Sequence, residues 1–103
     1  MTPKTKIFLL NNAHNPTGKL FSRAELEVIS QILNENPQIL VISDDVYEFL
    51  TFDGKTSTLF ASIGDNYKKT VSIFSGGKLF CCTGWKLGWA IAPHQFIERA
   101  GII

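Results

Sequence analysis

The sequence has almost no net charge, no long hydrophobic run and few cysteines. Its 103 residues include 10 basic and 9 acidic side chains, for a formal net charge of +1. Because acids are interspersed among the basic residues, no charged surface for nucleic acid or an anionic membrane is predicted. The longest apolar runs, such as residues 39–42 and 89–92, are far too short to span a bilayer. We therefore expect no nucleic-acid or membrane partner, and the composition favours a site for a small molecule.

The N-terminus and the cysteines exclude further classes of protein. Residues 1–4, Met-Thr-Pro-Lys, lack the apolar region of a signal peptide, which favours a cytoplasmic location and leaves the mitochondrial matrix open. Cys81 and Cys82 are adjacent, which disfavours an ordinary disulfide between them and does not match the spacing of zinc ligands. We therefore expect no metal site and two buried, reduced thiols.

Hydrophobic patterning predicts an α/β fold. Apolar segments rich in β-branched or aromatic residues predict strands at residues 6–11, 38–43, 70–74 and 86–92. Ser22 and Glu25 form a capping-box pattern, and apolar residues then recur on one face, so residues 22–35 should be helical. A strand, a helix and a strand in that order predict a right-handed crossover and a parallel pair of strands.

The second half of the chain predicts one more parallel strand and an antiparallel one. Residues 45–69 are long enough for a second crossover, although only residues 59–63 suggest a short helix. The connection before residues 86–92 has no clear helix, so this strand should be antiparallel to its neighbour. Pro93 should end it, and residues 94–103 should begin a helix. The expected sheet has three parallel strands and one antiparallel strand, with flanking helices.

Such a sheet should not be covered by this chain alone. A mostly parallel sheet needs helices over both faces, and the sequence predicts one convincing helix. One face should be bare, and the first strand should be an exposed edge that promotes aggregation. We therefore expect residues 1–103 to be part of a larger domain, and the isolated chain to be poorly soluble.

Polar residues follow each predicted parallel strand. Ligands of open α/β sheets bind outside the carboxyl ends of the strands. An amide, a carboxylate, a phenol, a hydroxyl and an amine should therefore meet at one edge, a set suited to an aromatic ring with polar corners and an anionic tail. The segments concerned are Asn11 to Gly18, Ser43 to Tyr47 and Ser75 to Lys78.

These segments, in this order and spacing, carry a resemblance to a known family. The runs Asn-Pro-Thr-Gly at 15–18, Ser-Asp-Asp-Val-Tyr at 43–47, Ser-Gly-Gly-Lys at 75–78 and Thr-Gly-Trp-Lys-Leu-Gly at 83–88 resemble motifs of class I and II aminotransferases. These are pyridoxal-phosphate (PLP) enzymes of fold type I. The closest likeness is to the kynurenine aminotransferase and cysteine-S-conjugate β-lyase group. The resemblance implies that residues 1–103 are an internal fragment of the large PLP-binding domain, without the N-terminal segment and the C-terminal small domain, and that the parent is a homodimer.

The resemblance assigns the chemistry to Lys78 and Asp44. Lys78 would form a Schiff base with the PLP aldehyde and later move the α-proton. Asp44 would pair with the pyridine nitrogen and keep it protonated. A lone lysine is usually only solvated, and an acid at a strand end can be a turn residue or a helix cap. Asp45 stands where relatives usually have glutamate, and no catalytic role is assigned to it.

Four further residues would hold the cofactor. The resemblance implies that Tyr47 and Asn15 hydrogen-bond the phenolic oxygen of the ring, and that Ser75 and Lys86 bind the phosphate. Many relatives have arginine at the position of Lys86. A packed aromatic residue and an asparagine in an Asx-turn are the competing interpretations of Tyr47 and Asn15.

Two classes of function remain open on these residues. The parent of such a fragment would transfer an amino group between an amino acid and a 2-oxo acid through the Lys78 Schiff base. β-Elimination from cysteine conjugates would use the same residues, so the sequence does not separate the two reactions. The alternative class is a non-catalytic product, such as a truncated isoform, a gene remnant or an incomplete gene model. We expect the isolated chain to have no measurable transaminase turnover.

Overall fold

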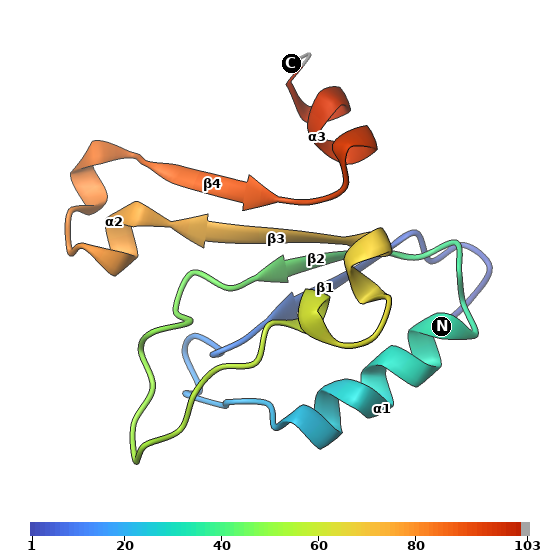
Figure 1. The fold of residues 1–103 in the computed structure, drawn as a ribbon, viewed down its shortest axis with the longest axis horizontal. Helices are drawn as coiled ribbons and strands as arrows, with labels where there is room; N and C mark the ends of the chain where they lie inside the picture. Colours follow the sequence, from blue (N-terminus) through green and yellow to red (C-terminus); the bar gives the residue numbers. More distant parts are fainter. Residues whose placement is uncertain (102–103) are drawn as a thin grey trace.

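A four-stranded sheet forms the centre of the computed structural model, which describes residues 1–101 (Figure 1). The strands lie in chain order, with the first three parallel and the last antiparallel to its neighbour. The predicted α/β class and the direction of every strand are therefore confirmed. The strands are β1 (Ile7–Asn11), β2 (Leu40–Asp44), β3 (Thr70–Ser75) and β4 (Gly88–Ile91).

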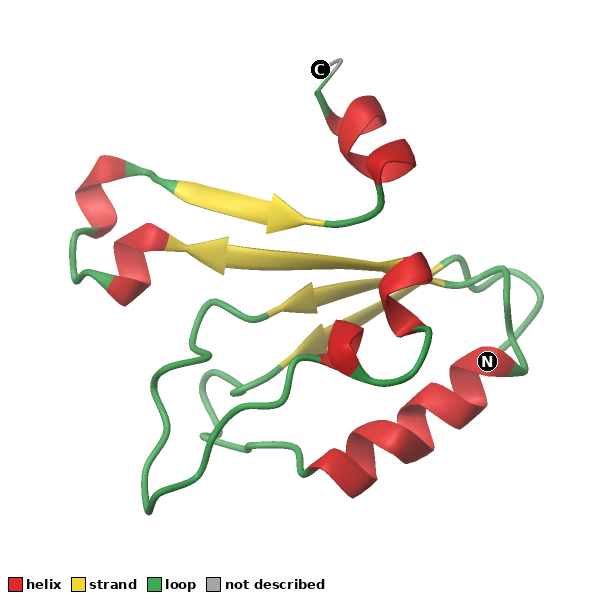
Figure 2. Cartoon of the chain, in the orientation of Figure 1, coloured by secondary structure: helices red, strands yellow, loops and turns green. Residues whose placement is uncertain are grey.

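Helix α1 (Arg23–Asn34) connects β1 to β2 and covers one face of the sheet (Figure 2). Its start is the predicted capping box: the Ser22 side chain accepts from the Glu25 backbone N–H, and the Glu25 carboxylate accepts from the Ser22 backbone N–H. Leu26 and Leu33 are fully buried, and they pack in one cluster with residues of β1 and β2. The predicted helix and its buried stripe are confirmed.

The connection from β2 to β3 contains no α-helix. It folds into two short 3-10 turns, η1 (Phe60–Ser62) and η2 (Asn66–Lys69), in place of the short helix expected at residues 59–63. Phe60 and Ile63 complete the core beside α1. Asn66 is buried and accepts from the Ser30 hydroxyl at 3.0 Å, which ties the connection to α1. The short helix suggested at residues 59–63 is therefore a 3-10 turn, and these contacts hold the connection against α1.

After β3 the chain forms a helical turn, α2 (Gly76–Leu79), a 3-10 turn, η3 (Thr83–Trp85), and then β4. The prediction that the last strand begins at residue 86 is wrong by two residues. Lys86 has φ of 54°, in the left-handed region, which is incompatible with an extended strand. The thiols were also predicted wrongly: both are free, but Cys81 is exposed and Cys82 is half-buried.

Helix α3 (His94–Ala100) follows Pro93, as predicted. The predicted helix was drawn to residue 103, and residues 102–103 lie outside the described part of the chain. None of the helices within residues 1–101 combines the length and apolarity needed to cross a bilayer.

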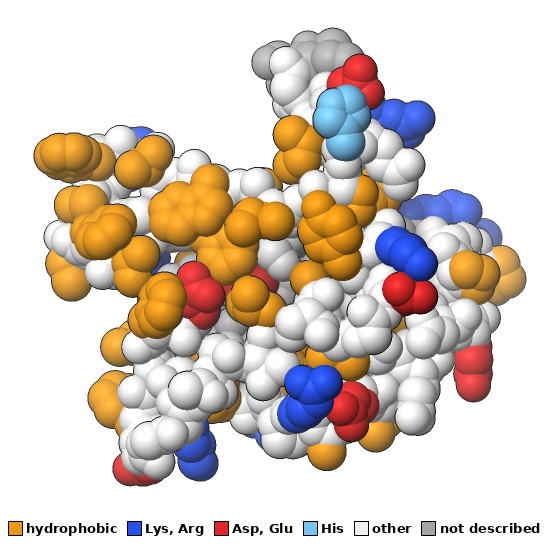
Figure 3. Space-filling model, viewed as in Figure 1, with side chains coloured by type: hydrophobic (Ala, Val, Ile, Leu, Met, Phe, Trp, Pro, Cys, Tyr) orange, Lys and Arg blue, Asp and Glu red, His pale blue; other side chains and the backbone are white. Residues whose placement is uncertain are grey.

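Hydrophobic side chains remain exposed on the face of the sheet opposite α1. Ile7, Leu9 and Ile73 point there and are 55%, 68% and 37% exposed. Around β4 and α2, Phe80 and Leu87 are also exposed, and hydrophobic side chains gather over this region (Figure 3). The expected bare face and the expected edge position of β1 are therefore both present.

Candidate functional site

The carboxyl ends of the three parallel strands meet at one edge of the sheet. Asp44 at the end of β2 is in register with Asn11 of β1 and with Ile73 of β3. Since side chains alternate along a strand, Asp44 shares a face with Ser75, two residues beyond Ile73. The segments that leave this edge carry five of the residues predicted for the site: Asn15, Asp44, Tyr47, Ser75 and Lys78.

A chain of hydrogen bonds joins the loop after β1 to the turn after β2. The Asn11 side-chain amide donates to the Asp44 carbonyl at 2.9 Å, and its oxygen accepts from the Asn15 backbone N–H at 3.0 Å. The Asn15 side-chain amide in turn donates to the Tyr47 hydroxyl at 3.2 Å. Two residues predicted to bind the same oxygen of a ring are thus in direct contact.

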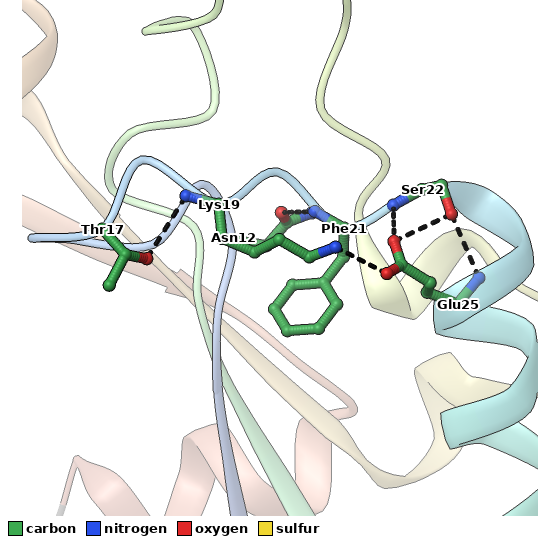
Figure 4. Close-up of polar contacts among 6 residues, drawn as sticks. All are labelled: Asn12, Thr17, Lys19, Phe21, Ser22 and Glu25. Atoms are coloured by element: carbon green, nitrogen blue, oxygen red, sulfur yellow. Dashed lines mark hydrogen bonds and ion pairs between the residues drawn. The ribbon is translucent and has the colours of Figure 1, made fainter.

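Asn12 holds the loop that carries Asn15. Its side chain is buried, accepts from the Phe21 backbone N–H at 3.0 Å and donates to the Thr58 carbonyl at 3.2 Å. The capping box of α1 follows immediately, so the loop between β1 and α1 is anchored at both ends (Figure 4). A loop held in this way keeps Asn15 in place without help from a ligand.

A hollow of about 440 Å³ opens beside the pair of Asn15 and Tyr47. Its walls include the apolar side chains of Leu50 and Phe52, which are 59% and 72% exposed. Asp53 and Lys55 also line it, so the hollow carries a side chain of each charge. The side of the site formed by β1 and β2 therefore offers polar contacts next to apolar surface.

A second hollow, of about 350 Å³, lies beside α2 and is lined by three more of the predicted residues. Ser75 is the N-cap of α2, and its hydroxyl accepts from the Lys78 backbone N–H at 3.2 Å. Lys86 reaches the same hollow from the end of η3. Ser75, Lys78 and Lys86 are therefore brought together. Thr83, which the sequence analysis did not single out, lines the hollow as well.

Two glycines let the backbone close tightly around this second hollow. A Cβ atom at Gly77 would lie 3.0 Å from Cα of Thr83, and one at Gly88 would lie 2.9 Å from the carbonyl oxygen of Phe74. Lys86 adopts the left-handed conformation at the same place, which costs roughly 1–2 kcal/mol for a residue with a Cβ. Strain of this kind concentrates at functional sites, which supports a role for the Lys86 side chain.

Asp44 stands on β2 between the two groups. It is half-buried, and one carboxylate oxygen accepts from the Val46 backbone N–H at 3.4 Å. Within residues 1–101, no hydrogen bond links Asn15 or Tyr47 to the residues of the second hollow. A ligand that used every predicted residue would have to bridge the two groups across Asp44.

Asp45 is the residue that the sequence analysis passed over. It is fully buried, and burial raises the pKa of its carboxyl group to about 6, against the opposing effect of a hydrogen bond from Ser43. A signal was present in the sequence: Val41, Ser43 and Asp45 are two residues apart, so the buried face of β2 continues to Asp45.

Comparison with known proteins gives the family. The family model for aminotransferase class I and II matches residues 1–103. The chain is 46% identical, over 97 residues, to the kynurenine–oxoglutarate transaminase of Dictyostelium discoideum, covering 93% of this chain and 22% of that protein. It is 41% identical, over 98 residues, to kynurenine–oxoglutarate transaminase 1 of Rattus norvegicus, covering 95% of this chain and 23% of that protein.

Solved structures share the fold over the same length. N-succinyldiaminopimelate aminotransferase from Mycobacterium tuberculosis superposes with a TM-score of 0.91 at 40% identity, over 95% of this chain and 25% of that one. An aromatic aminotransferase from Pyrococcus horikoshii superposes with a TM-score of 0.91 at 35% identity, over 96% of this chain and 26% of that one. A PLP-bound putative aminotransferase from Clostridium difficile, at 24% identity, has the same fold with a TM-score of 0.84. The chain thus spans about a quarter of the length of the relatives it matches, and it belongs to the aminotransferase class I and II family.

Proposed function

We propose that this chain supplies part of the PLP-binding large domain of an aminotransferase, with Lys78 as the residue that holds the cofactor covalently. The observation that supports this most directly is the hollow beside α2, where an amine, a hydroxyl and a second ammonium group lie together. Membership of a PLP-dependent family makes PLP the cofactor to test first.

The residues present fit PLP by the chemistry of their donors. Ser75 and Lys86 offer a hydroxyl and a cation for a phosphate, and the tight backbone at Gly77 lets the chain close around a small anion. Lys78 adds the primary amine that the aldehyde of PLP requires. When bound, PLP acts as an electron sink that lets an amino acid lose its α-proton.

The remaining roles belong to the neighbouring strand end. Asp44 would place a carboxylate at the pyridine nitrogen, where its negative charge favours the protonated ring. Tyr47 and Asn15 would donate hydrogen bonds to the phenolic oxygen. Their mutual contact at 3.2 Å supports this joint assignment, because it holds the two donors next to each other. The free amine of Lys78 would carry the proton removed from the substrate.

The proposed reaction is amino-group transfer between an amino acid and a 2-oxo acid. The similar proteins from Dictyostelium and rat are named for kynurenine and oxoglutarate, so this pair is the first to assay. The relatives extend well beyond the segment that this chain matches. The active species would therefore be a longer parent protein that contains this chain together with counterparts of the relatives' other segments.

Covalent trapping tests the assignment of Lys78. The chain is incubated with PLP, reduced with borohydride and digested, and the labelled peptide is identified by mass spectrometry. We expect the label on Lys78, and its loss in Lys78→Arg. Lys4→Arg, at an exposed N-terminal position, is the matched control and should leave labelling unchanged. A label spread evenly over exposed lysines, or none on Lys78, contradicts the proposal.

A further inference from the structure

Asp45 is a buried carboxyl group for which the proposed reaction has no use. It lies directly after β2, at the edge where the site forms, and its relative exposure is 0%. The Ser43 hydroxyl donates to one of its oxygens at 3.0 Å. A buried carboxyl group is costly unless its interactions compensate, so its presence beside the site calls for a physical role.

The cluster around Asp45 is polar and only partly satisfied. The second carboxyl oxygen of Asp45 and the hydroxyl of Ser72 are both buried, and neither has a hydrogen-bond partner among the described residues 1–101. Ser72 is in register with Ser43 on the adjacent strand, so the two hydroxyls lie on the same face as Asp45. The Ser72 hydroxyl is near enough to counter the rise in the Asp45 pKa, although its geometry falls short of a hydrogen bond. The two unpaired atoms thus lie on one buried face of the sheet.

The backbone of Asp45 fixes the turn that carries the proposed ring-binding residues. Its N–H donates to the Ile73 carbonyl at 2.9 Å, which extends the contact between β2 and β3 by one residue. Its carbonyl accepts from the Glu48 N–H at 3.0 Å, which closes the turn around Tyr47. Asp44 is adjacent and points to the opposite face of the strand. The buried Asp45 thus fixes the turn that carries Asp44 and Tyr47, two residues of the proposed site.

We infer that Asp45 is a positioning residue, whose buried side chain anchors the turn of residues 44–48 and thereby aims the Asp44 carboxylate and the Tyr47 hydroxyl at the bound ring. The inference rests on the proposed function, because it concerns how this chain holds PLP. It adds a residue that touches neither the cofactor nor the substrate. It also explains why a carboxyl group is buried on the same face as the hydroxyls of Ser43 and Ser72.

The test compares PLP binding by the chain with Asp45 intact, replaced by asparagine and replaced by alanine. Asp45→Asn keeps the shape and the hydrogen-bonding capacity, whereas Asp45→Ala removes both. Asp65→Asn and Asp65→Ala are matched controls at an acid whose side chain is 86% exposed. The dissociation constant for PLP is measured by equilibrium dialysis. The absorbance of the bound cofactor is titrated with pH, because it reports the groups around the ring.

We expect Asp45→Ala to weaken PLP binding by roughly 10-fold or more, the size typical when a residue that orients a ligand-binding group is removed. The pH titration of the bound cofactor should shift with it. Asp45→Asn should restore binding to within about 3-fold, since it can still accept from Ser43. The Asp65 variants should match the unsubstituted chain in both measurements.

The outcomes separate the inference from the proposed function. No PLP binding by the unsubstituted chain contradicts the proposed function and the inference together. Normal binding by a folded Asp45→Ala variant, with an unshifted pH titration, contradicts the inference alone, even if its thermal stability falls. If Asp45→Ala does not fold, Ser43→Ala takes its place, because it removes the hydroxyl that holds Asp45. Binding and titration unchanged in Ser43→Ala then overturn the inference.

Discussion

The Asn15 side-chain amide donates a hydrogen bond to the Tyr47 hydroxyl at 3.2 Å, which joins the loops that follow two adjacent parallel strands. These residues are 32 positions apart in the sequence. Their contact means that the two proposed donors to the ring oxygen are already assembled in the folded chain.

Substitutions of this pair should not be additive. We expect Tyr47→Phe and Asn15→Ala each to weaken PLP binding by about 5-fold, the equivalent of one neutral hydrogen bond of about 1 kcal/mol. The double variant should lose less than the product of the single losses, because each single change also disturbs the partner. Equilibrium dialysis of the four proteins measures this. Strict additivity would mean that the contact does not matter for binding.

Position 86 should separate stability from cofactor binding. Lys86 has φ of 54°, so glycine should be more stable there than alanine, by roughly 1–2 kcal/mol of unfolding free energy. Both variants lack the ammonium group and should bind PLP more weakly than the unsubstituted chain, whereas Lys86→Arg should keep most of the affinity. Urea denaturation and dialysis provide the two measurements. Equal stability of the glycine and alanine variants would contradict the strained backbone.

Asp45 should make stability depend on pH in a defined direction. Its pKa of about 6 in the folded chain lies above the ordinary value of 3.8, so the folded state binds the proton more tightly than the unfolded state. The free energy of unfolding should therefore fall as pH rises from about 4 to about 6, by an amount on the order of 3 kcal/mol, and level off above.

Asp45→Asn should flatten this part of the stability profile, because the asparagine side chain does not titrate. Denaturation of both proteins between pH 4 and pH 8 checks it. Glu48, whose pKa burial also raises, contributes a slope of the same sign and should persist in the variant. An identical profile in the variant would show that Asp45 is not the group responsible.

The capping box should contribute to the stability of α1. Ser22→Ala removes the side-chain acceptor for the Glu25 backbone N–H and should lower the unfolding free energy by about 1 kcal/mol. Ser22→Asp keeps an acceptor and should lose much less. Thermal denaturation followed by circular dichroism compares the variants. A larger loss in the aspartate variant than in the alanine variant would contradict the assigned role of the hydroxyl.

The uncovered face of the sheet should make the isolated chain self-associate. Leu9 is 68% exposed on this face and lies on the edge strand β1, so Leu9→Lys should reduce association without unfolding the chain. Leu10→Lys is the matched comparison: Leu10 is 4% exposed in the core, and the same change there should destabilise the fold. Sedimentation velocity measures the first effect. A monomeric unsubstituted chain would contradict the prediction.

Local signals in the sequence were enough to predict much of the fold. The Ser22 cap and the spacing of Leu26 and Leu33 gave the position of α1 to within a residue at each end. The order of strand, helix and strand then gave the parallel pair of β1 and β2, because chirality allows few other arrangements. The shared edge of the strand ends followed from that topology.

The parts that were missed depend on contacts between distant residues. The start of β4 depends on the left-handed conformation of Lys86, next to the place where the Gly77 and Thr83 backbones approach closely. No local pattern in the sequence predicts this contact. The β2–β3 connection is held by the buried amide of Asn66 in place of a helix. The burial of Asp45 follows from the alternation of side chains along β2, which continues into the turn, whereas the family resemblance assigned this residue no role.

The N-cap of α2 has a consequence for anion binding. The Ser75 oxygen accepts from the Lys78 amide through a lone pair, so its O–H can still donate to the phosphate of the proposed cofactor. Threonine at position 75 would keep both interactions, because its hydroxyl can also accept from the Lys78 amide and donate to a phosphate. Alanine would loosen the turn that carries Lys78 and remove the donor proposed for the phosphate, so a single hydroxyl would link the placement of the amine to the binding of the anion.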